Sequence, residues 1–334
     1  MIWDRGYTSS YYMTLVDPSS WRDMARVEIT GGNISRVSTG LLASGTISAT
    51  DWDRGETWVR VYLDAQQNAS SEHIPLITGL TSVPEKNVNG VLQTYDIQIY
   101  SVLKPLEDML LPRGWYAVAG SDGAKVISEL LSVTPAPVIV SGESPRLSES
   151  IIAEENETYL SMVEKILLAI NWRIRLQGDG TIELTSKATT ASFNLDPVNA
   201  DYIEPDITIE RDWYTCPNVF IATSGDASGI ARDEDVNSPL SIPSRGREIW
   251  KSETAADINT GETIAEYAAR RLKEEQQIAT TARYSRRFIP DLYPSDVVFL
   301  RYPEQSLQGM YRIDSQSVVL GYAARTTEEV LKLG

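Results

Sequence analysis

The chain has 334 residues, of which 42% are hydrophobic, and it carries 46 Asp and Glu against 30 Lys and Arg, for a formal net charge of −16. This charge disfavours tight sequence-independent binding of nucleic acid, because an acidic surface repels phosphate. A single Cys excludes an internal disulfide, and without a run of 18 or more apolar residues we expect no membrane insertion.

The length and the N-terminal residues set further expectations. At roughly 150 residues per domain, the length suggests two or three domains. The apolar fraction is high enough for a sizeable core, so wholesale disorder is not expected. No signal peptide is recognisable at the N-terminus. We therefore expect a protein that is made in a reducing cytoplasm.

Residues 1–104 show the alternation of a β domain. In "TWVRVYLD" (57–64), Val59, Val61 and Leu63 fall on one face, and the residues between them fall on the other. This period of two indicates a half-buried strand. Short strands of this kind, separated by turn residues, predict a sandwich or a barrel.

The stretch "RVEITGGNISRV" (26–37) raises the question of a phosphate-binding loop at Gly31-Gly32-Asn33. Such a loop needs backbone N–H groups at the start of a helix, with Lys and Ser or Thr close behind. An extended run follows here instead. Since Gly and Asn accept positive φ at little cost, we interpret the segment as a hairpin turn.

Two further joins in this region carry turn residues. "DWDRGE" (51–56) offers the carboxylates of Asp51, Asp53 and Glu56, but Gly55 comes too late for a calcium loop. We interpret it as a hairpin turn, with a cation site as the alternative. "VNG" (88–90) is a second predicted turn.

Residues 105–198 predict an α+β middle domain. A Pro-, Gly- and Ser-rich stretch (132–145) is typical of a connector. After it, apolar residues recur at the spacing of one helical face, at Leu160, Val163, Leu167 and Ile170. Two alternating runs then flank Gly178-Asp179-Gly180, and Asp-Gly between such runs is a strong hairpin signal.

Residues 199–334 predict a second β domain. The segment 224–262 is polar, with few large apolar residues, and we interpret it as a long excursion or a mobile loop. A helix is predicted over 262–277, where Glu266 and Arg270 form an i,i+4 pair in the favoured order. Strand-like runs close the chain.

The chain offers little for catalysis or metal binding. His73 is the single histidine, so any Ser-His or Cys-His relay would have to use it, yet Cys216 lies in a different region. One Cys and one His cannot assemble the usual zinc ligand sets. A Gly-rich nucleotide fingerprint is also absent. We therefore predict no catalytic, cofactor-binding or metal-binding residue and no enzyme activity.

The aromatic residues allow two interpretations. The sequence contains 8 Trp and 16 Tyr, which could form a sugar-binding surface or ordinary strand packing. Tyr11, Tyr12 and Trp115 are less easily placed in a core. We interpret these three as possible interface anchors, because Tyr and Trp are enriched at protein interfaces.

The order of these elements resembles that of the tail hub, or baseplate hub, proteins of tailed bacteriophages, in the form of a short hub without a fused lytic domain. Each stretch that carries the resemblance is a loose pattern, and their order and the chain length carry the specificity. The stretches are 26–37 with "TISATDW" (46–52), "YSVLKPLEDMLLPRGWYAVAGSDGAKVISELL" (100–131), "VEKILLAINWRIRLQGDGTIELTS" (163–186), "AEYAARRLKEEQQ" (265–277), "FIPDLYPSDVVFLRYP" (288–303) and "GMYRIDSQSVVL" (309–320).

The resemblance implies a β-rich α+β fold with two related antiparallel β-barrel-like tube domains, 1–104 and 199–334, and an α+β segment, 105–198, between them. It implies a homotrimer that joins a sixfold tail tube, or distal tail protein, to a threefold spike or tip. Its channel would pass DNA without binding it specifically, or hold the end of the tape-measure protein. Such a protein would be located at the tail tip or baseplate of a virion assembled in the host cytoplasm.

Two hypotheses and one alternative function accompany this reading. We expect that part of the Asp and Glu excess lines the channel, and that segment 224–262 contacts a neighbouring subunit or tail protein. The alternative function is a tail-tip cell-wall hydrolase or carbohydrate-binding module that uses paired carboxylates, which would lie roughly 5–10 Å apart in a deep cleft. Oligomeric state and internal symmetry would discriminate between the two functions.

Overall fold

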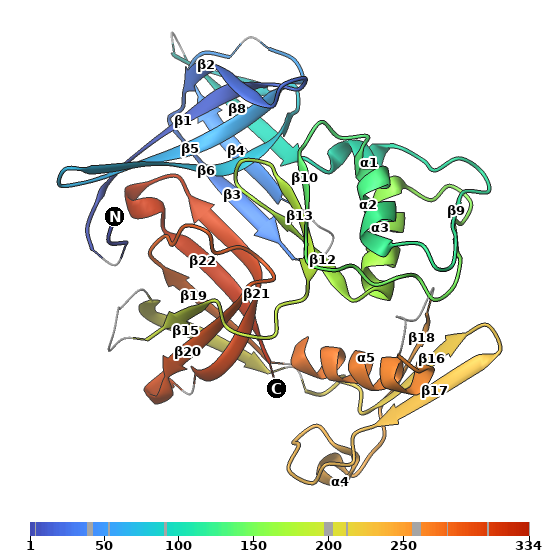
Figure 1. Ribbon diagram of the computed structural model, residues 1–334. Helices are drawn as coiled ribbons and strands as arrows, with labels where there is room; N and C mark the ends of the chain where they lie inside the picture. The colour runs from blue at the N-terminus through green and yellow to red at the C-terminus, as the bar shows by residue number, and fades with distance from the viewer. Residues whose placement is uncertain are drawn as a thin grey trace.

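A computed structural model describes the chain apart from residues 4, 39–42, 53, 90–91, 197–202, 212, 256–261, 279, 306 and 334, and apart from the side chains of residues 92, 277, 278 and 305. The described residues form a β-rich α+β fold, as the sequence predicts. One large sheet runs through the molecule, with α1, α2 and α3 gathered on one side of it and α5 beside its C-terminal part (Figure 1).

The first β unit precedes the helices. Its strands are β1 (Thr8–Asp17), β2 (Arg22–Glu28), β3 (Gly31–Val37), β4 (Ala43–Ala49), β5 (Trp58–Gln67), β6 (Ser70–Thr81), β7 (Glu85–Asn89) and β8 (Leu92–Ser101). Val59, Val61 and Leu63 of β5 are fully buried, which confirms the predicted alternation. The core of this unit also contains Val318 and Leu320 from the end of the chain.

The second β unit is built from strands on either side of an insertion. Its elements are β14 (Phe193–Leu195), β15 (Ile203–Arg211), β19 (Thr280–Arg286), β20 (Val297–Tyr302), η2 (Pro303–Gln305), β21 (Leu307–Val319), η3 (Tyr322–Ala324) and β22 (Thr326–Lys332). A separate cluster of buried residues lies between these strands, including Tyr284, Leu300 and Ile313.

The two β units share one sheet. In the described residues the sheet has 14 strands, and its main path runs β15-β19-β22-β21-β3-β4-β8-β6-β5-β1-β2. The antiparallel pair β21–β3 joins the units, with Ser317 opposite Ser35 and Val318 opposite Ile34. The seam is therefore an ordinary strand ladder, and the units are fixed relative to each other by backbone hydrogen bonds.

The predicted hairpin turn at Gly31-Gly32-Asn33 is wrong. These residues lie inside β3, and β2 does not pair with β3 but with β1 at the end of the sheet. The glycine is needed for a close approach rather than for a turn: a Cβ atom on Gly32 would lie 2.4 Å from the Thr46 carbonyl oxygen of the neighbouring strand β4.

The segment 51–56 is not a hairpin turn either. It connects β4 to β5, and these strands are separated in the sheet by β8 and β6. Asp53 lies outside the described residues. The second predicted turn, 88–90, falls where β7 and β8 pair antiparallel with Asn89 opposite Leu92, although residue 90 itself is outside the described part.

The middle unit is α+β, as predicted. Its elements are α1 (Lys104–Asp108), β9 (Tyr116–Ala117), α2 (Gly123–Leu131), β10 (Val138–Ser141), β11 (Ile151–Ile152), α3 (Tyr159–Ala169), β12 (Trp172–Leu176) and β13 (Ile182–Ser186). The predicted apolar face of α3 is buried in the core of this unit. The hairpin around Gly178-Asp179-Gly180 is confirmed, since Leu176 pairs with Ile182. The predicted connector contains a strand, because β10 pairs parallel with β13.

The segment 224–262 is folded where the structure describes it, so the predicted excursion or mobile loop is wrong there. It supplies β17 (Ala227–Arg232), α4 (Ile242–Arg245) and β18 (Trp250–Thr254), and both strands pair with β16 (Val219–Ser224). The predicted helix is present as α5 (Ile264–Ile278) and packs on this small sheet. Apolar residues of β16 and α5, such as Phe220 and Tyr267, provide the core that the polar segment lacks.

This inserted unit projects from the second β unit, near the bottom of Figure 1. Residues 199–334 thus contain two separate hydrophobic clusters of appreciable size, one in the second β unit and one beneath α5. The domain boundaries at residues 104 and 198 remain a prediction.

Candidate assembly surfaces

One face of the common sheet carries a belt of small uncharged polar side chains that crosses the seam. A row runs from Ser285 to Thr327, Ser317, Ser35 and Ser44, each opposite the next on the neighbouring strand. Asn33, Thr46 and Gln98 form a second row. We call these eight residues the hydroxyl–amide belt.

Six of the eight belt residues bind one another in pairs. The Ser317 hydroxyl donates to Asn33 Oδ1 at 3.0 Å, and the Thr46 hydroxyl donates to Gln98 Oε1 at 3.0 Å. Between β19 and β22, the hydroxyls of Ser285 and Thr327 lie 3.0 Å apart. These side chains are half-buried or exposed, so the belt presents an uncharged, hydrogen-bonded surface.

A buried ionic network lies on the opposite face of the same strands. Arg286 donates through Nε and Nη2 to the two oxygens of Glu328, at 2.8 and 2.5 Å, and both side chains are almost completely buried. Although burial lowers the pKa of Arg286, the contact with Glu328 raises it above its ordinary value. Arg286 is therefore held in its charged form.

This network reaches across the seam through Gln316. Its Nε2 donates to Glu328 Oε1 at 2.6 Å and to the Leu292 carbonyl at 2.9 Å, while its Oε1 accepts from Arg36 Nη1 at 3.4 Å. Arg36 also donates to the Leu76 carbonyl. The network therefore connects β19, β22 and β21 of the second unit to β3 of the first.

The middle unit is anchored to the first β unit by its Gly178-Asp179-Gly180 hairpin. Arg60 Nη2 and Trp21 Nε1 both donate to the Asp179 carbonyl, at 2.9 and 3.0 Å, and the Thr78 hydroxyl donates to the Gly178 carbonyl at 2.9 Å. A Cβ atom on Gly178 would lie 1.8 Å from the Pro75 carbonyl oxygen. The contact thus depends on glycine.

The inserted unit offers a second surface. Helix α5 packs on one face of its sheet. We call the opposite face, which includes Trp250 and Ile230, the open face. On that open face, Trp250 and Ile230 are about half exposed, at 49% and 52%. Arg232 stacks over Trp250, 5.2 Å from the ring centroid. Exposed Trp and Arg residues are typical of protein interfaces.

Charged side chains hold α5 in place. Arg271 binds Glu253 of β18 at 2.8 Å and Glu274 at 2.5 Å, and Lys187 binds Glu274 at 3.1 Å. Although burial works against ionisation, Lys187, Arg271 and Arg270 lower the pKa of Glu274 from 4.5 to about 2. Glu274 thus links the inserted unit to Lys187, which follows the middle unit.

The residues considered for catalysis are not brought together. His73 lies on β6, 62% exposed, with Nδ1 2.5 Å from Asp64 Oδ1. Cys216 is buried in the inserted unit against Leu240. Among the described residues, no group of three or more His, Cys, Asp or Glu side chains could hold a metal ion.

The alternative hydrolase function needs paired carboxylates in a cleft. The walls of a cavity of about 560 Å³ between α3, α5 and the second β unit include Glu164 and Glu274. Burial raises the pKa of Glu164 in its wall. Glu274, also in the wall, has both carboxylate oxygens engaged by Lys187 and the arginines of α5. The oxygens of Glu274 are therefore occupied by structural ion pairs.

The aromatic residues that the sequence suggests as interface anchors are used within the chain. Tyr11 donates to the Gly321 carbonyl at 2.5 Å, Tyr12 stacks on Tyr62 with ring centroids 5.0 Å apart, and Trp115 packs against the middle core. The exposed aromatics lie elsewhere, at Tyr100, Tyr116, Tyr214, Trp250 and Tyr322. Sequence reasoning missed Trp250, whose signal was a large aromatic residue inside a polar segment.

No helix in the described part of the chain has both the length and the apolar character needed to cross a membrane.

Comparison with known proteins gives results for structure and not for sequence. No protein-family model and no curated protein matches the sequence. Among solved structures, a tail protein from Neisseria meningitidis MC58 has a TM-score of 0.72 at 14% identity, over 98% of this chain and 96% of that one. The 43 kDa tail protein of prophage MuSo2 from Shewanella oneidensis has a TM-score of 0.67 at 14% identity, over 97% of each chain.

A third similar structure comes from a secretion system. The c3393 protein of Escherichia coli, described as a type VI secretion component with structural similarity to the phage T4 tail proteins gp27 and gp5, has a TM-score of 0.53 at 10% identity. It is matched over 92% of this chain and 74% of that one. The chain described here therefore has the fold of phage tail proteins, across nearly its whole length.

Proposed function

We propose that this chain is a structural hub protein of a phage-type tail, located at the tail tip or baseplate. The proposal rests on the fold that this chain shares with the Neisseria meningitidis tail protein and the MuSo2 prophage tail protein. The shared fold covers at least 96% of each chain. A fold hosts more than one function, so the surfaces of this chain supply the remaining support.

The proposed assembly is a homotrimeric ring. Each copy contributes two β units that already share one sheet through β21 and β3. Three copies would thus present six β units, which matches a sixfold tail tube or distal tail protein on one side. On the other side, the same ring would have the threefold symmetry of a spike or tip.

The proposed channel wall is the hydroxyl–amide belt. Uncharged side chains that bind one another leave few groups to grip a phosphate backbone or a tape-measure protein, so the contents could slide past. The eight belt residues carry no charge, and Asp96 and Glu329 lie on the same face, two residues along the strand from Gln98 and Thr327. We therefore keep the expectation that Asp and Glu line part of the channel, beside the belt. DNA would be present only in passage.

The inserted unit is proposed to contact a neighbouring subunit or tail protein through the open face around Trp250 and Ile230. The sequence hypothesis that segment 224–262 contacts a neighbouring subunit or tail protein is thus kept. Its basis is now the partly apolar surface of a folded segment. Work of this kind requires no bond to be made or broken, and we propose a non-enzymatic role.

Electron cryomicroscopy of intact particles tests the proposal, together with light scattering on the purified chain. We expect a threefold ring with the belt facing its axis and a tube and a spike or tip protein on its two sides. A chain that stays monomeric, and that hydrolyses cell-wall material through Glu164, would overturn the proposal in favour of the hydrolase.

A further inference from the structure

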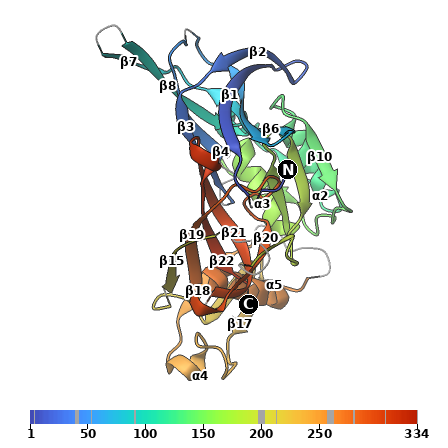
Figure 2. The same cartoon turned by 90° about the vertical axis from the view of Figure 1, so that its left-hand side faces the viewer.

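A small cavity lies where the first β unit, the middle unit and the second β unit meet. Its wall includes Arg36 of β3, Ser101 of β8, Ile174 of β12 and Ser295 of the loop before β20. Figure 2 shows the middle unit, in green, beside the place where the blue strands of the first β unit meet the red strands of the second. The cavity volume of about 30 Å³ is room for about two water molecules.

The wall of this cavity carries a positive charge. Arg36 is the single charged residue among the described residues that line it, so no described Asp or Glu belongs to the wall. Arg36 is 7% exposed, and its hydrogen-bond acceptors are neutral: the Gln316 amide oxygen and the Leu76 carbonyl. A buried charge without a counter-charge is costly.

The charged groups near Arg36 do not supply the missing negative charge. Both oxygens of Glu328 are bound by Arg286, so two guanidinium groups and one carboxylate leave a net charge of +1. Arg175, which has carboxylate partners of its own, approaches the same Tyr293 ring as Arg36, at 4.6 and 4.9 Å from the ring centroid. Burial lowers the pKa of Arg36, and the like charges of Arg286 and Arg175 also lower it.

Two serine side chains add hydrogen-bond donors to the wall. Ser101 is 4% exposed, and its Oγ accepts from the Leu103 N–H at 3.2 Å, while its O–H has no acceptor in the described part of the chain. Ser295 donates its backbone N–H to the Ile313 carbonyl at 2.7 Å, and its hydroxyl makes no hydrogen bond to a described residue. Arg36 has five N–H groups and uses two of them.

We propose that this cavity binds one small monovalent inorganic anion, such as chloride, between the Arg36 guanidinium and the hydroxyls of Ser101 and Ser295. The anion balances the net charge of +1, which a water molecule cannot do. Phosphate and acetate contain more heavy atoms than the two waters for which the cavity has room. Because its donors come from both β units, the anion would strengthen the seam. The inference goes beyond the proposed function and does not depend on it.

Thermal unfolding of the full chain tests the site, in sodium chloride and in sodium gluconate at equal ionic strength. Gluconate is too large for the cavity, and an anion that binds only the folded chain stabilises it. We expect the unfolding midpoint to be about 2–4 °C higher in chloride. Arg36→Met removes the charge, so the difference between the two salts should disappear.

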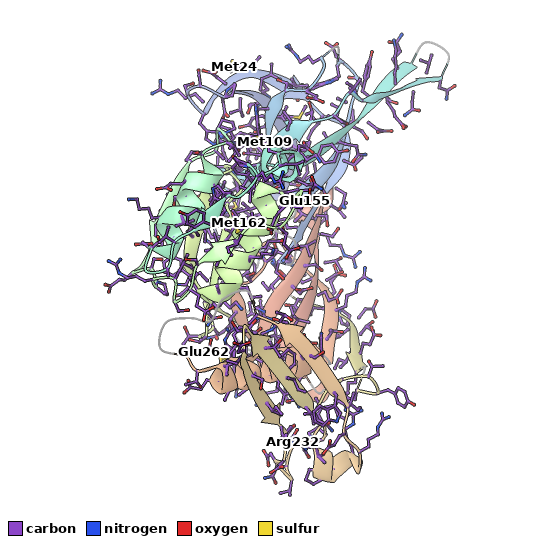
Figure 3. The ribbon with its side chains drawn as sticks, turned by 90° about the vertical axis from the view of Figure 1, so that its right-hand side faces the viewer. Met24, Met109, Glu155, Met162, Arg232 and Glu262 are labelled. Atoms are coloured by element: carbon purple, nitrogen blue, oxygen red, sulfur yellow. The ribbon has the colours of Figure 1, made fainter. Side chains whose placement is uncertain are left out.

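Two further variants keep this test sharp. Ser101→Ala retains the guanidinium and should need several-fold more chloride for half of the effect, which carries the comparison if Arg36→Met does not fold. Arg232→Gln is the control for general salt effects. Arg232 is exposed, pairs with Glu248 and lies in the inserted unit, near the lower end of the molecule in Figure 3. Its variant should respond to chloride as the wild-type chain does.

Bromide locates the ion directly, because it scatters X-rays anomalously. In crystals of the full chain soaked in sodium bromide, we expect one bromide per chain in contact with Arg36 and Ser101. A cavity that contains only water in those crystals overturns the inference, as does a chloride effect that Arg36→Met or Ser101→Ala retains in full. Either result leaves the proposed tail function unaffected.

Discussion

Arg36 and Gln316 lie opposite each other across the seam of the common sheet, 280 positions apart in the sequence, and Arg36 Nη1 donates to Gln316 Oε1 at 3.4 Å. Through Gln316, Arg36 reaches the buried pair of Glu328 and Arg286. The seam between the two β units is thus held by a backbone ladder and by a buried polar network. Because such a network has few satisfactory geometries, it should resist bending of one unit against the other.

The first prediction concerns this network. Glu328→Gln leaves the Arg286 guanidinium buried without a compensating charge, so we expect the free energy of unfolding to fall by roughly 3–5 kcal/mol. Glu329→Gln is the control, because its side chain lies on the other face of β22 and is only half-buried. Chemical denaturation of both variants measures the difference, and equal losses would contradict the role given to the buried pair.

The second prediction concerns the anchor of the middle unit. Gly178→Ala places a Cβ atom against the Pro75 carbonyl, and we expect a loss of roughly 1–3 kcal/mol, as for other overpacked contacts. Gly55→Ala is the control, because no atom lies within 4 Å of a Cβ at that position. Thermal unfolding provides the measurement. An unchanged midpoint for Gly178→Ala would show that the hairpin is not tightly docked.

The third prediction concerns pH. The pKa of Glu274 falls from 4.5 to about 2 on folding, so its ionised form stabilises the folded chain. This stabilisation is complete above about pH 4.5 and is lost as the pH falls through about 2. Glu274→Gln should therefore cost roughly 1–3 kcal/mol at pH 7 and only about 0.4 kcal/mol near pH 2.

Unfolding measured between pH 7 and pH 2 checks the Glu274 prediction. Glu234→Gln, at an exposed position of the inserted unit, should track the wild-type chain throughout. A Glu274→Gln deficit that stays constant down to pH 2 would show that the carboxylate charge is not the cause.

The fourth prediction concerns the proposed channel wall. Thr46→Lys with Gln98→Lys places six new positive charges in a trimeric ring, at exposed belt positions. Since lysine attracts phosphate, we expect particles in normal numbers but with DNA release slowed at least tenfold at low salt. The control is Ser70→Lys, at an exposed site away from the belt. Normal release from the belt variant would mean that this face does not line the channel.

The fifth prediction concerns the inserted unit. Trp250→Ala with Ile230→Glu should leave the trimer intact but weaken its attachment to the adjoining subunit or tail protein by at least tenfold, because two exposed apolar side chains of the open face are lost. Pull-down from assembling cells measures attachment. Met24→Ala, at an exposed residue of β2, is the control. Full attachment of the double variant would assign another role to this face.

Local features of the fold could be predicted from the sequence. The face of α3 follows from apolar residues spaced at the helical period. Helix α5 begins with a reciprocal cap, in which Thr263 and Glu266 each bind the other's backbone N–H. The β12–β13 hairpin follows from Gly178-Asp179-Gly180, because the loop itself selects the turn. Each of these signals acts within a few residues.

Other features depended on partners distant in the sequence. The sequence shows that Gly31 and Gly32 are permissive, but only the fold shows that Gly32 faces the Thr46 carbonyl of β4. Likewise, segment 51–56 has turn composition, yet β4 and β5 are kept apart by two strands. Turn residues predict that the chain bends, but they do not determine which strand the next strand pairs with.

The sequence by itself determined the β-rich α+β class, the period of each strand and helix, and a strongly acidic balance. Only the tertiary structure decided that the two β units share one sheet, that the polar segment folds on β16 and α5, and that the belt crossing the seam is uncharged. The reason is physical: backbone hydrogen bonds between strands look alike for every sequence, so the choice of partner strand is made by side-chain packing between distant segments, which no local pattern records.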